Sequence, residues 1–553
     1  MRRSPLSLCP QPIGPIPDET ARVARAAFPK GNLYLTIRDQ IGVLFNDEMF
    51  APLFSPCGQP AETPWRLALV CVMQFIEGLS DRQASEAVRD RLAWKYLLGL
   101  ELTDPGFHYS VLSEFRDRLI AGTVEQRLLD TLLARCEEQG WLKARGQQRT
   151  DSTHVLAAIR TLNRLELVGE TLRATLNALA AVAPAWLQAL APAEWFERYS
   201  LRVEESRLPK GLEARTAYGA AIGADGMALL TAVYAPDAPV WLREIPAVET
   251  LRLLWIQQYV VTDGHVQLRA ADDLPPAGAR LDSPYEPDAR YGNKRTTTWT
   301  GYKVHLTETC DADAVHLITH VETTPAQIAD ADMGRPIHDA LVAKDLPPHA
   351  HFMDSGYVDA GLVVSSARTH GIEVVGPMRP NSSWQAREGT GYDASAFVVD
   401  WERRVVTCPQ GRTNSSWAER RDAWGNEHVV AKFSRTDCRL CAARSLCTRQ
   451  ETAARLVQLR PQADRELLHE VRRQQETAEW QARYRRRAGI EGTLSQAIRA
   501  YELREARYVG LAKTRLQHIL MATGINLVRM AAWLDGTRPA KTRVSHFAAL
   551  AAA

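Results

Sequence analysis

The sequence lacks the long, uninterrupted apolar run that a signal peptide or a membrane span requires. Residues 1–17 are broken by prolines, and the charge-free run 174–193 contains two prolines and two polar amides. Internal repeats and low-complexity tracts are also missing, apart from a bias towards alanine. We therefore expect a protein of the cytoplasm that has no membrane partner.

Cysteine is scarce, and its odd count of nine, without a signal peptide, argues against a disulfide framework. Four cysteines nevertheless cluster late in the chain, namely Cys408, Cys438, Cys441 and Cys447. The two-residue gap between Cys438 and Cys441 lets both thiolates point into one tetrahedron. Four thiolates would close the shell of a single structural zinc. The alternative is four free thiols in a reducing compartment.

A strong excess of one charge is missing from the whole chain, whose net charge is +2. The balance is uneven, because residues 471–553 hold 15 Lys and Arg against 6 Asp and Glu, a local charge of +9 that leaves −7 on the remainder. A basic end favours contact with phosphates, although such tails often serve solubility alone.

A chain of 553 residues is too long for a single core, and its 45% hydrophobic and 24% charged content is typical of a globular protein with several domains. We predict six parts. They are an irregular arm (1–60) with one helix at 33–45, a helical domain (61–140), an α/β core (141–400) with a helical insertion at about 160–280, a cysteine-rich insert (401–450), a helical return to the core (451–535) and a tail (536–553).

Short helices separated by tight turns are expected at 65–76, from Ser80, at 93–98, from Ser110 and at 124–141. Arginines on their exposed faces suit a helix-turn-helix-like DNA-binding module. A plain helical bundle explains the pattern equally well.

Strand and helix patterns alternate after this domain, which predicts an α/β fold with a mixed sheet. The expected elements are a short strand ending at Asp151, strands from Thr300 and Val315 joined as a hairpin, a helix at 328–342 and strands at 350–354 and 373–376.

Two aspartates, Asp151 and Asp354, are expected at strand ends, where open α/β sheets usually carry their sites. A third carboxylate, Glu491, lies in Q-A-R-Y-R-R-R-A-G-I-E-G-T. If this stretch is one α-helix, Tyr484, Arg487 and Glu491 share one face within about 60°. Three carboxylates could hold two Mg²⁺ or Mn²⁺ ions for phosphodiester chemistry. The structural alternative is a solvated helix with an ordinary Arg487–Glu491 pair.

Gly489 and Gly492 flank this glutamate, and each would cost roughly 1 kcal/mol inside a helix. We therefore expect something, such as a DNA strand, to approach the backbone closely at both positions.

These motifs, Q-R-T-D-S-T-H, F-M-D-S-G-Y and Y-R-R-R-A-G-I-E-G-T, resemble the three acidic motifs of bacterial insertion-sequence transposases of the DDE class. The resemblance extends over most of the chain, from S-E-F-R-D-R-L to R-Y-V-G-L-A-K-T-R-L-Q-H. It implies a ribonuclease-H-like core in which Asp151, Asp354 and Glu491 are the catalytic, metal-binding triad. It also implies that the protein is associated with the nucleoid. Its partner would be double-stranded DNA, both the transposon ends and the target, bound by a homodimer or larger assembly.

By the same resemblance, Tyr484 and Arg487 belong to a Tyr-Arg-Glu-Lys signature that contacts DNA near the transposon end. The signature's lysine is expected seven residues after the glutamate, where this chain has Ile498, followed by Arg499 about 80° away around a helix. Besides an active transposase, an inactive DNA-binding regulator and a nuclease without strand transfer therefore remain as alternatives.

Two further groups need an interpretation. His154 and His351 lie three residues from the aspartates, so a phosphohydrolase with histidine and carboxylate ligands is an alternative. It leaves the shared face of Tyr484 to Glu491 unexplained, so we expect structural or supporting roles for both histidines. Lys294, Arg295, Trp299 and Lys303 form a basic, aromatic stretch that could grip a phosphate backbone and stack a displaced base. The alternative is a strand with Trp299 in the core.

Overall fold

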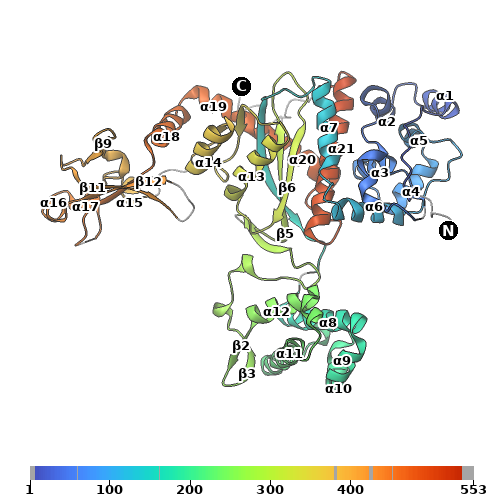
Figure 1. Cartoon of the computed structure of the whole chain (residues 1–553), viewed down its shortest axis with the longest axis horizontal. Helices are drawn as coiled ribbons and strands as arrows, with labels where there is room; N and C mark the ends of the chain where they lie inside the picture. The colour runs from blue at the N-terminus through green and yellow to red at the C-terminus, as the bar shows by residue number, and fades with distance from the viewer. Residues whose placement is uncertain are drawn as a thin grey trace, which may run out of the picture. The chain divides into compact units, whose positions relative to one another are not determined.

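Figure 1 shows the computed structural model of the chain, which describes residues 7–58, 60–160, 162–294, 296–378, 383–422, 427–450 and 452–538. The described residues divide into two compact units. The first draws on 1–143, 151–328 and 491–553, and the second on 144–150 and 329–490. Each unit is described by itself below.

The central element is a six-stranded mixed sheet, which confirms the predicted α/β class. Its order is β4-β5-β1-β7-β8, with β6 paired to β5. The strands are β1 (Gln147–Leu156), β4 (Arg290–Lys294), β5 (Thr297–Thr309), β6 (Ile318–Pro325), β7 (Ala350–Phe352) and β8 (Glu373–Val375). Strands β4, β5 and β6 are antiparallel, whereas β7 is parallel to both β1 and β8. Strand β4 was not predicted.

Strand β1 does not end at Asp151 as the sequence predicted, but runs on to Leu156. The extension is held from the far end of the chain, since the Leu156 N–H donates to the Arg504 carbonyl (2.7 Å) and the Ala506 N–H donates to the Leu156 carbonyl (2.9 Å). A partner this distant in sequence could not be read from the local pattern.

Seven α-helices precede the sheet in the described residues, and the last five confirm the predicted helical region. They are α1 (Asp18–Ala27), α2 (Leu33–Thr36), α3 (Pro64–Ile76), α4 (Asp81–Asp90), α5 (Leu92–Leu98), α6 (Ser110–Ala121) and α7 (Arg127–Glu138). Ser80 caps α4 through a complete capping box with Gln83. Helix α1 was missed, and the helix expected at 33–45 consists of α2 and a π-turn, Ile37–Ile41.

Helix α21 (Leu511–Leu534) organises the first unit, because it packs against α3, α7 and β6 (Figure 1). The buried Asn526 amide on α21 pairs with the backbone of Ile318 in both directions, at 2.8 Å each. This side chain completes the start of β6 and fixes α21 to the sheet.

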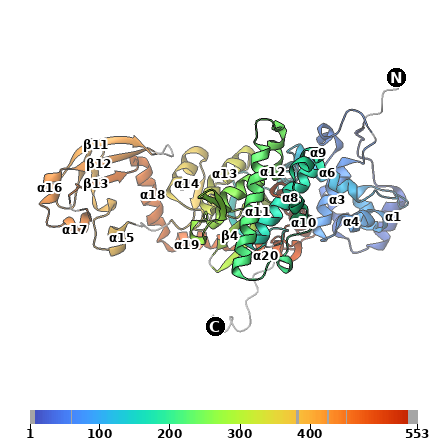
Figure 2. The same ribbon diagram turned by 90° about the horizontal axis from the view of Figure 1, so that it is seen from below.

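The predicted helical insertion is present in the first unit (Figure 2). It comprises α8 (Arg164–Val182), α9 (Pro184–Leu190), α10 (Ala193–Tyr199), α11 (Leu212–Val233), α12 (Pro246–Gln258) and a hairpin of β2 (Tyr259–Thr262) and β3 (His265–Leu268). Gly223 and Gly226 of α11 lie so close to Tyr259 and Trp255 that a Cβ atom at either would clash with the ring. The glycines therefore allow close packing within the insertion core.

Among the described residues, α11 is the one helix long and apolar enough to cross a membrane, a possibility that the sequence analysis overlooked. A single helix of this kind is weak evidence, because core helices pass the same test. Its glycine face packs against the rings of Tyr259 and Trp255.

The second unit contains α13 (Asp330–Ala343), α14 (Ala360–Ser365), α18 (Gln462–Gln475) and α19 (Ala478–Tyr484). The cysteine-rich insert in this unit is a small β lobe. It contains a pair, β9 (Val398–Asp400) and β10 (Val405–Thr407), and a three-stranded sheet of β11 (Asn414–Arg421), β12 (Glu427–Phe433) and β13 (Leu456–Leu459). Its core is thin and includes Phe397, Val406, Phe433 and Val457.

Candidate active site

Asp151 lies within β1 and is 7% exposed. Its Oδ1 atom accepts the Ser152 N–H at 2.8 Å. The neighbouring Thr153 hydroxyl accepts a hydrogen bond from Arg504 Nε at 2.9 Å, so this part of the strand is tied to the segment that follows helix α20 (Gly489–Tyr501). A carboxylate fixed on a strand in this way is suited to metal ligation, because its position costs no further ordering.

Asp354 follows β7 by two residues and is partly exposed. Its Oδ1 atom accepts the Gly356 N–H at 2.8 Å, which shapes the turn after the strand. A Cβ atom at Gly356 would lie 2.9 Å from Asp354 Oδ1 and 3.6 Å from Asp330 Oδ2. Asp330 is thus a neighbouring carboxylate that the sequence analysis missed. The sequence signal for Asp330 is an acidic residue in the first turn of α13. Acidic residues at this position usually only stabilise the helix through its dipole, so they do not indicate a site.

Glu491 lies in the first turn of α20 and is exposed. The prediction that one continuous α-helix carries Tyr484, Arg487 and Glu491 is wrong. Helix α19 ends at Tyr484, a 3₁₀ turn covers Arg485–Ala488, and α20 then begins at Gly489. A 3₁₀ turn repeats every three residues rather than every 3.6, so the expected single α-helical face does not apply across this stretch.

The two glycines beside Glu491 differ. A Cβ atom at Gly489 would lie 1.9 Å from Arg149 Nη1, whereas nothing lies within 4 Å at Gly492. Arg149 Nη1 donates to the Arg486 carbonyl at 2.8 Å across this gap. The predicted close approach is therefore confirmed at Gly489, where the protein's own arginine makes it, whereas at Gly492 no described residue of the protein makes it.

The arginine-rich stretch before Glu491 is partly engaged. Arg483 forms a two-pronged ion pair with Glu373 (3.0 and 2.7 Å), and Arg486 Nη1 donates to Gln147 Oε1, although Arg485 and Arg486 are both exposed. Tyr484 is half-buried and stacks on Trp480, with ring centroids 5.0 Å apart. Arg487 is half-buried as well, and Arg499 is exposed on α20.

The basic stretch near the first hairpin favours the structural alternative. Trp299 is 5% exposed, its Nε1–H donates to the Tyr302 carbonyl at 2.9 Å, and its ring lies against His154. A ring held in the core is not available to stack a displaced base. Lys303 Nζ donates to the Ile328 carbonyl at 2.7 Å, Lys294 is exposed at the end of β4, and Arg295 lies outside the described residues.

Neither histidine near the aspartates is arranged as a metal ligand. His351 is fully buried, and both of its ring nitrogens are used, Nε2 by the Thr150 hydroxyl (2.7 Å) and Nδ1 by His338 Nε2 (2.8 Å). His154 packs against Trp299, and burial lowers its pKa, helped by Arg504 and Lys294. Structural roles account for both.

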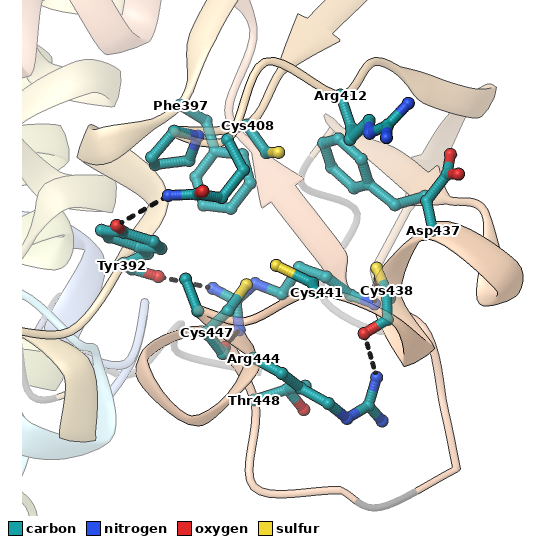
Figure 3. A pocket seen from close by; sticks show the side chains of 15 residues that line it. Tyr392, Phe397, Cys408, Arg412, Asp437, Cys438, Cys441, Arg444, Cys447 and Thr448 are labelled. Carbon is teal, nitrogen blue, oxygen red and sulfur yellow. Dashed lines mark hydrogen bonds between the residues drawn. The ribbon is translucent and has the colours of Figure 1, made fainter.

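The four clustered cysteines line one small cavity in the β lobe (Figure 3). Burial raises the pKa of Cys447, and the other three thiols raise it further, although Arg455 opposes them. Within the described ranges no group of three or more His, Cys, Asp and Glu side chains has the geometry of a formed metal site. The predicted grouping of the four thiols is confirmed, whereas the zinc that they would bind remains a prediction.

Comparison with known families adds two matches. Residues 22–118 match the family described as Transposase domain (DUF772), and residues 407–531 match the Transposase DDE domain. The second match includes Glu491 but neither aspartate, and the first begins inside the predicted arm. The mixed α/β fold is consistent with a ribonuclease-H-like core. No curated protein matches the chain.

Proposed function

We propose that this chain, a transposase with a DDE domain and an N-terminal transposase domain, binds the terminal inverted repeats of its own mobile element, hydrolyses their phosphodiester bonds and joins the freed ends to target DNA. A DDE domain implies an enzyme of DNA cleavage and strand transfer that works with divalent metal ions. Recognition of terminal repeats, the identity of the catalytic residues and the steps of the reaction are the proposed parts.

The parallel register of β1 and β7 is the observation that carries the assignment of the two aspartates. Arg149 pairs with Phe352. Asp151 and Asp354 each lie two residues beyond this pair, in the same chain direction. Neighbouring parallel strands advance by similar steps, so this register supports two carboxylates that act together.

Glu491 is supported as the third carboxylate by three observations. It falls inside the DDE match, it is exposed, and the segment after its helix is hydrogen-bonded to the end of β1. Asp151, Asp354 and Glu491 offer only oxygen ligands, which suit Mg²⁺ or Mn²⁺. When two ions are bound, they would activate the attacking oxygen and stabilise the leaving oxygen.

DNA contacts are proposed for the exposed basic groups. Arg485, Arg486, Arg499 and Lys294 are exposed, and Tyr484 and Arg487 flank Arg485 and Arg486 in sequence. The proposed partners are double-stranded transposon ends and target DNA at the nucleoid in the cytoplasm, bound by a homodimer or larger assembly. No membrane partner is proposed.

A structural zinc is proposed for the β lobe. Four thiols around one cavity in a thin core have the donor set of a closed tetrahedral site, and binding would release their protons and add to folding. Four thiolates leave no position for water, so this zinc would have no part in the chemistry.

The decisive experiment follows cleavage of end-labelled DNA from the flanks of the element, with and without Mg²⁺. Asp151→Asn, Asp354→Asn and Glu491→Gln should each reduce cleavage by about 10²-fold or more, because each removes a proposed metal ligand. End binding, measured by gel shift, should remain near wild type. Normal cutting by Glu491→Gln would refute this glutamate and leave Glu502 and Glu505 as candidates.

The same experiment separates the alternatives. A wild-type protein that binds ends but never cuts would be a regulator. This alternative rests on Ile498, which occupies the position of the signature's lysine. Cutting without joined products would indicate a nuclease.

A further inference from the structure

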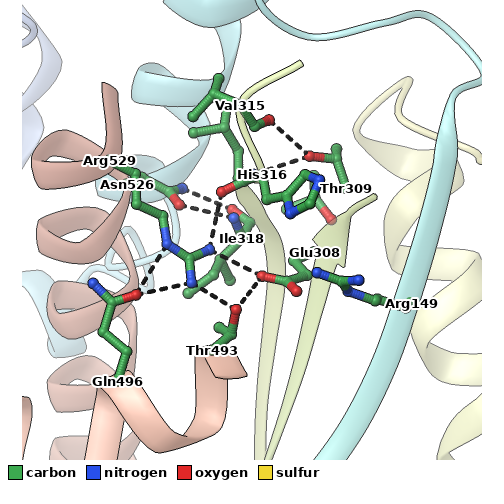
Figure 4. A network of polar contacts seen from close by, with 12 residues as sticks. Arg149, Glu308, Thr309, Val315, His316, Ile318, Thr493, Gln496, Asn526 and Arg529 are labelled. Atoms are coloured by element: carbon green, nitrogen blue, oxygen red, sulfur yellow. Dashed lines mark hydrogen bonds and ion pairs between the residues drawn. The ribbon is translucent and has the colours of Figure 1, made fainter. Parts of the chain in front are cut away.

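A buried ion pair lies beside helix α20 in the first unit. Glu308 of β5 is completely buried, and the side chain of Arg529 on α21 is 17% exposed. Arg529 Nη1 donates to Glu308 Oε2 at 2.9 Å and to the His316 carbonyl at 2.9 Å (Figure 4). The pair thus joins β5, α21 and the segment just before β6.

Two side chains of α20 enter the same network (Figure 4). The Thr493 hydroxyl accepts from Arg529 Nη2 at 2.6 Å and donates to Glu308 Oε2 at 2.5 Å. The Gln496 Oε1 atom accepts from Arg529 Nε and Nη2, at 3.1 and 2.9 Å. Charge-assisted hydrogen bonds of this kind are about twice as strong as neutral ones.

The network engages one face of α20. Thr493 and Gln496 are three residues apart and share one face, whereas Glu491 is about 200° from Thr493 at roughly 100° per residue. The exposure agrees, because Thr493 is 3% exposed and Glu491 is exposed. Holding Thr493 and Gln496 inward therefore directs Glu491 outward.

Stability alone is a poor reason for such a pair. Desolvating two charges costs several kcal/mol per ion, and apolar replacements of buried pairs are often neutral or stabilising. What directed hydrogen bonds provide and apolar packing does not is a single orientation, which a metal ligand requires within about 0.5 Å.

We propose that Glu308, Arg529, Thr493 and Gln496 form a positioning network that sets the rotation of α20, so that Glu491 can ligate the divalent metal. This inference rests on the proposed role of Glu491. None of the four side chains is proposed to touch DNA or metal, and each acts through the helix.

Thr493→Val tests the proposal, because it keeps the shape of the side chain and removes both hydroxyl hydrogen bonds. The matched control is Thr523→Val on α21, which removes another buried hydroxyl, one that donates to the Ile519 carbonyl of its own helix at 2.8 Å. Thr493→Ser restores the hydroxyl. Gln496→Leu provides a milder second change if Thr493→Val does not fold.

Cleavage of end-labelled element DNA is measured across a Mg²⁺ titration, with melting temperature and gel-shift affinity alongside. We expect Thr493→Val to raise the half-saturating Mg²⁺ concentration or to lower the maximal rate by about 10- to 100-fold, the usual effect of losing a group that orients a metal ligand. Gln496→Leu should act in the same direction. Thr493→Ser and Thr523→Val should keep the wild-type Mg²⁺ dependence.

A merely structural network would lower the melting temperature in both valine variants without changing the Mg²⁺ dependence, and that outcome overturns the proposal. Glu491→Gln is assayed in parallel. If Glu491→Gln cuts normally, the proposed function fails. If Glu491→Gln is inactive while the folded Thr493→Val and Gln496→Leu variants retain the wild-type Mg²⁺ dependence, the positioning inference alone fails.

Discussion

Two buried histidines in the second unit form a hydrogen-bonded relay between two hydroxyls. Thr150 contacts His351, His351 contacts His338, and His338 Nδ1 contacts the Ser366 hydroxyl at 2.8 Å. Each neutral ring supplies one donor and one acceptor, so the chain can be satisfied throughout. A doubly protonated His338 would place a positive charge in the interior, where burial disfavours it. The buried site therefore requires a neutral His338.

This requirement predicts how stability depends on pH. Burial lowers the pKa of His338 to about 4, with His370 adding to the effect and Asp339 opposing it. The unfolded side chain titrates near 6.5, so between these values only the unfolded chain binds the proton. The free energy of unfolding should therefore fall by up to about 3 kcal/mol as pH drops from 6.5 to 4.

Urea unfolding of wild type and His338→Gln at several pH values checks this prediction. The variant should show a flatter profile, whereas His349→Gln, which changes an exposed side chain, should keep the wild-type slope. Parallel profiles for wild type and His338→Gln would mean that the relay does not control the slope.

The glycines beside Glu491 give a second prediction at the scale of single residues. Gly489→Ala should destabilise the protein by about 1 to 3 kcal/mol, because the new methyl group displaces Arg149 from the Arg486 carbonyl. Gly492→Ala meets no atom within 4 Å and should stabilise helix α20 by up to about 1 kcal/mol. Urea midpoints measure both, and equal shifts for the two variants would contradict the crowding seen at Gly489.

At the scale of elements, the β lobe has little apolar material to hold it together. Its core cluster comprises seven buried hydrophobic residues, with three of the four cysteines packed against them. A lobe of this kind is the usual place for a stapling metal, since its own burial contributes little stability.

We expect purified protein to contain about one zinc per chain, bound through Cys408, Cys438, Cys441 and Cys447. Cys438→Ser should lower that content, and chelation should make residues 400–450 sensitive to proteases while the rest of the chain stays resistant. Cys57→Ser, at an exposed thiol of the first unit, is the control and should leave the zinc content unchanged. A zinc-free wild type that is fully folded would show these cysteines to be ordinary thiols.

At the scale of the whole molecule, the uneven charge governs the expected response to salt. Six to ten phosphate contacts would lower DNA affinity by about 10³- to 10⁵-fold between 50 and 200 mM salt. The structure divides the candidate arginines. Arg485→Ala should reduce the slope of log DNA affinity against log salt concentration by about 1, the value of one phosphate contact. Arg483→Ala should mainly lower the stability of the protein, because Arg483 is paired with Glu373.

Gel-shift titrations at several salt concentrations test this division. A wild-type affinity that stays flat across the range would remove the electrostatic part of the DNA-binding proposal. An unchanged slope in Arg485→Ala would remove this arginine from the contact surface.

The sequence by itself determined the class of the fold and most of its elements, because helical and strand periodicity are local properties. It found the helices at α3 to α7, the β5–β6 hairpin and the cysteine cluster. The three acidic motifs could also be recognised from the sequence, because each is a short stretch in which small or basic residues flank a carboxylate. Matches to two transposase families agree with this reading, although they leave the catalytic residues themselves as proposals.

Tertiary structure alone decided what those residues touch. The strand that continues past Asp151, the arginine that fills the space at Gly489 and the core position of Trp299 all depend on partners distant in sequence. The network at Glu308 depends on residues from β5, α20 and α21, which no local pattern links. Contacts with remote segments set the buried side of α20, because side-chain contacts outweigh the few tenths of a kcal/mol by which local propensities differ.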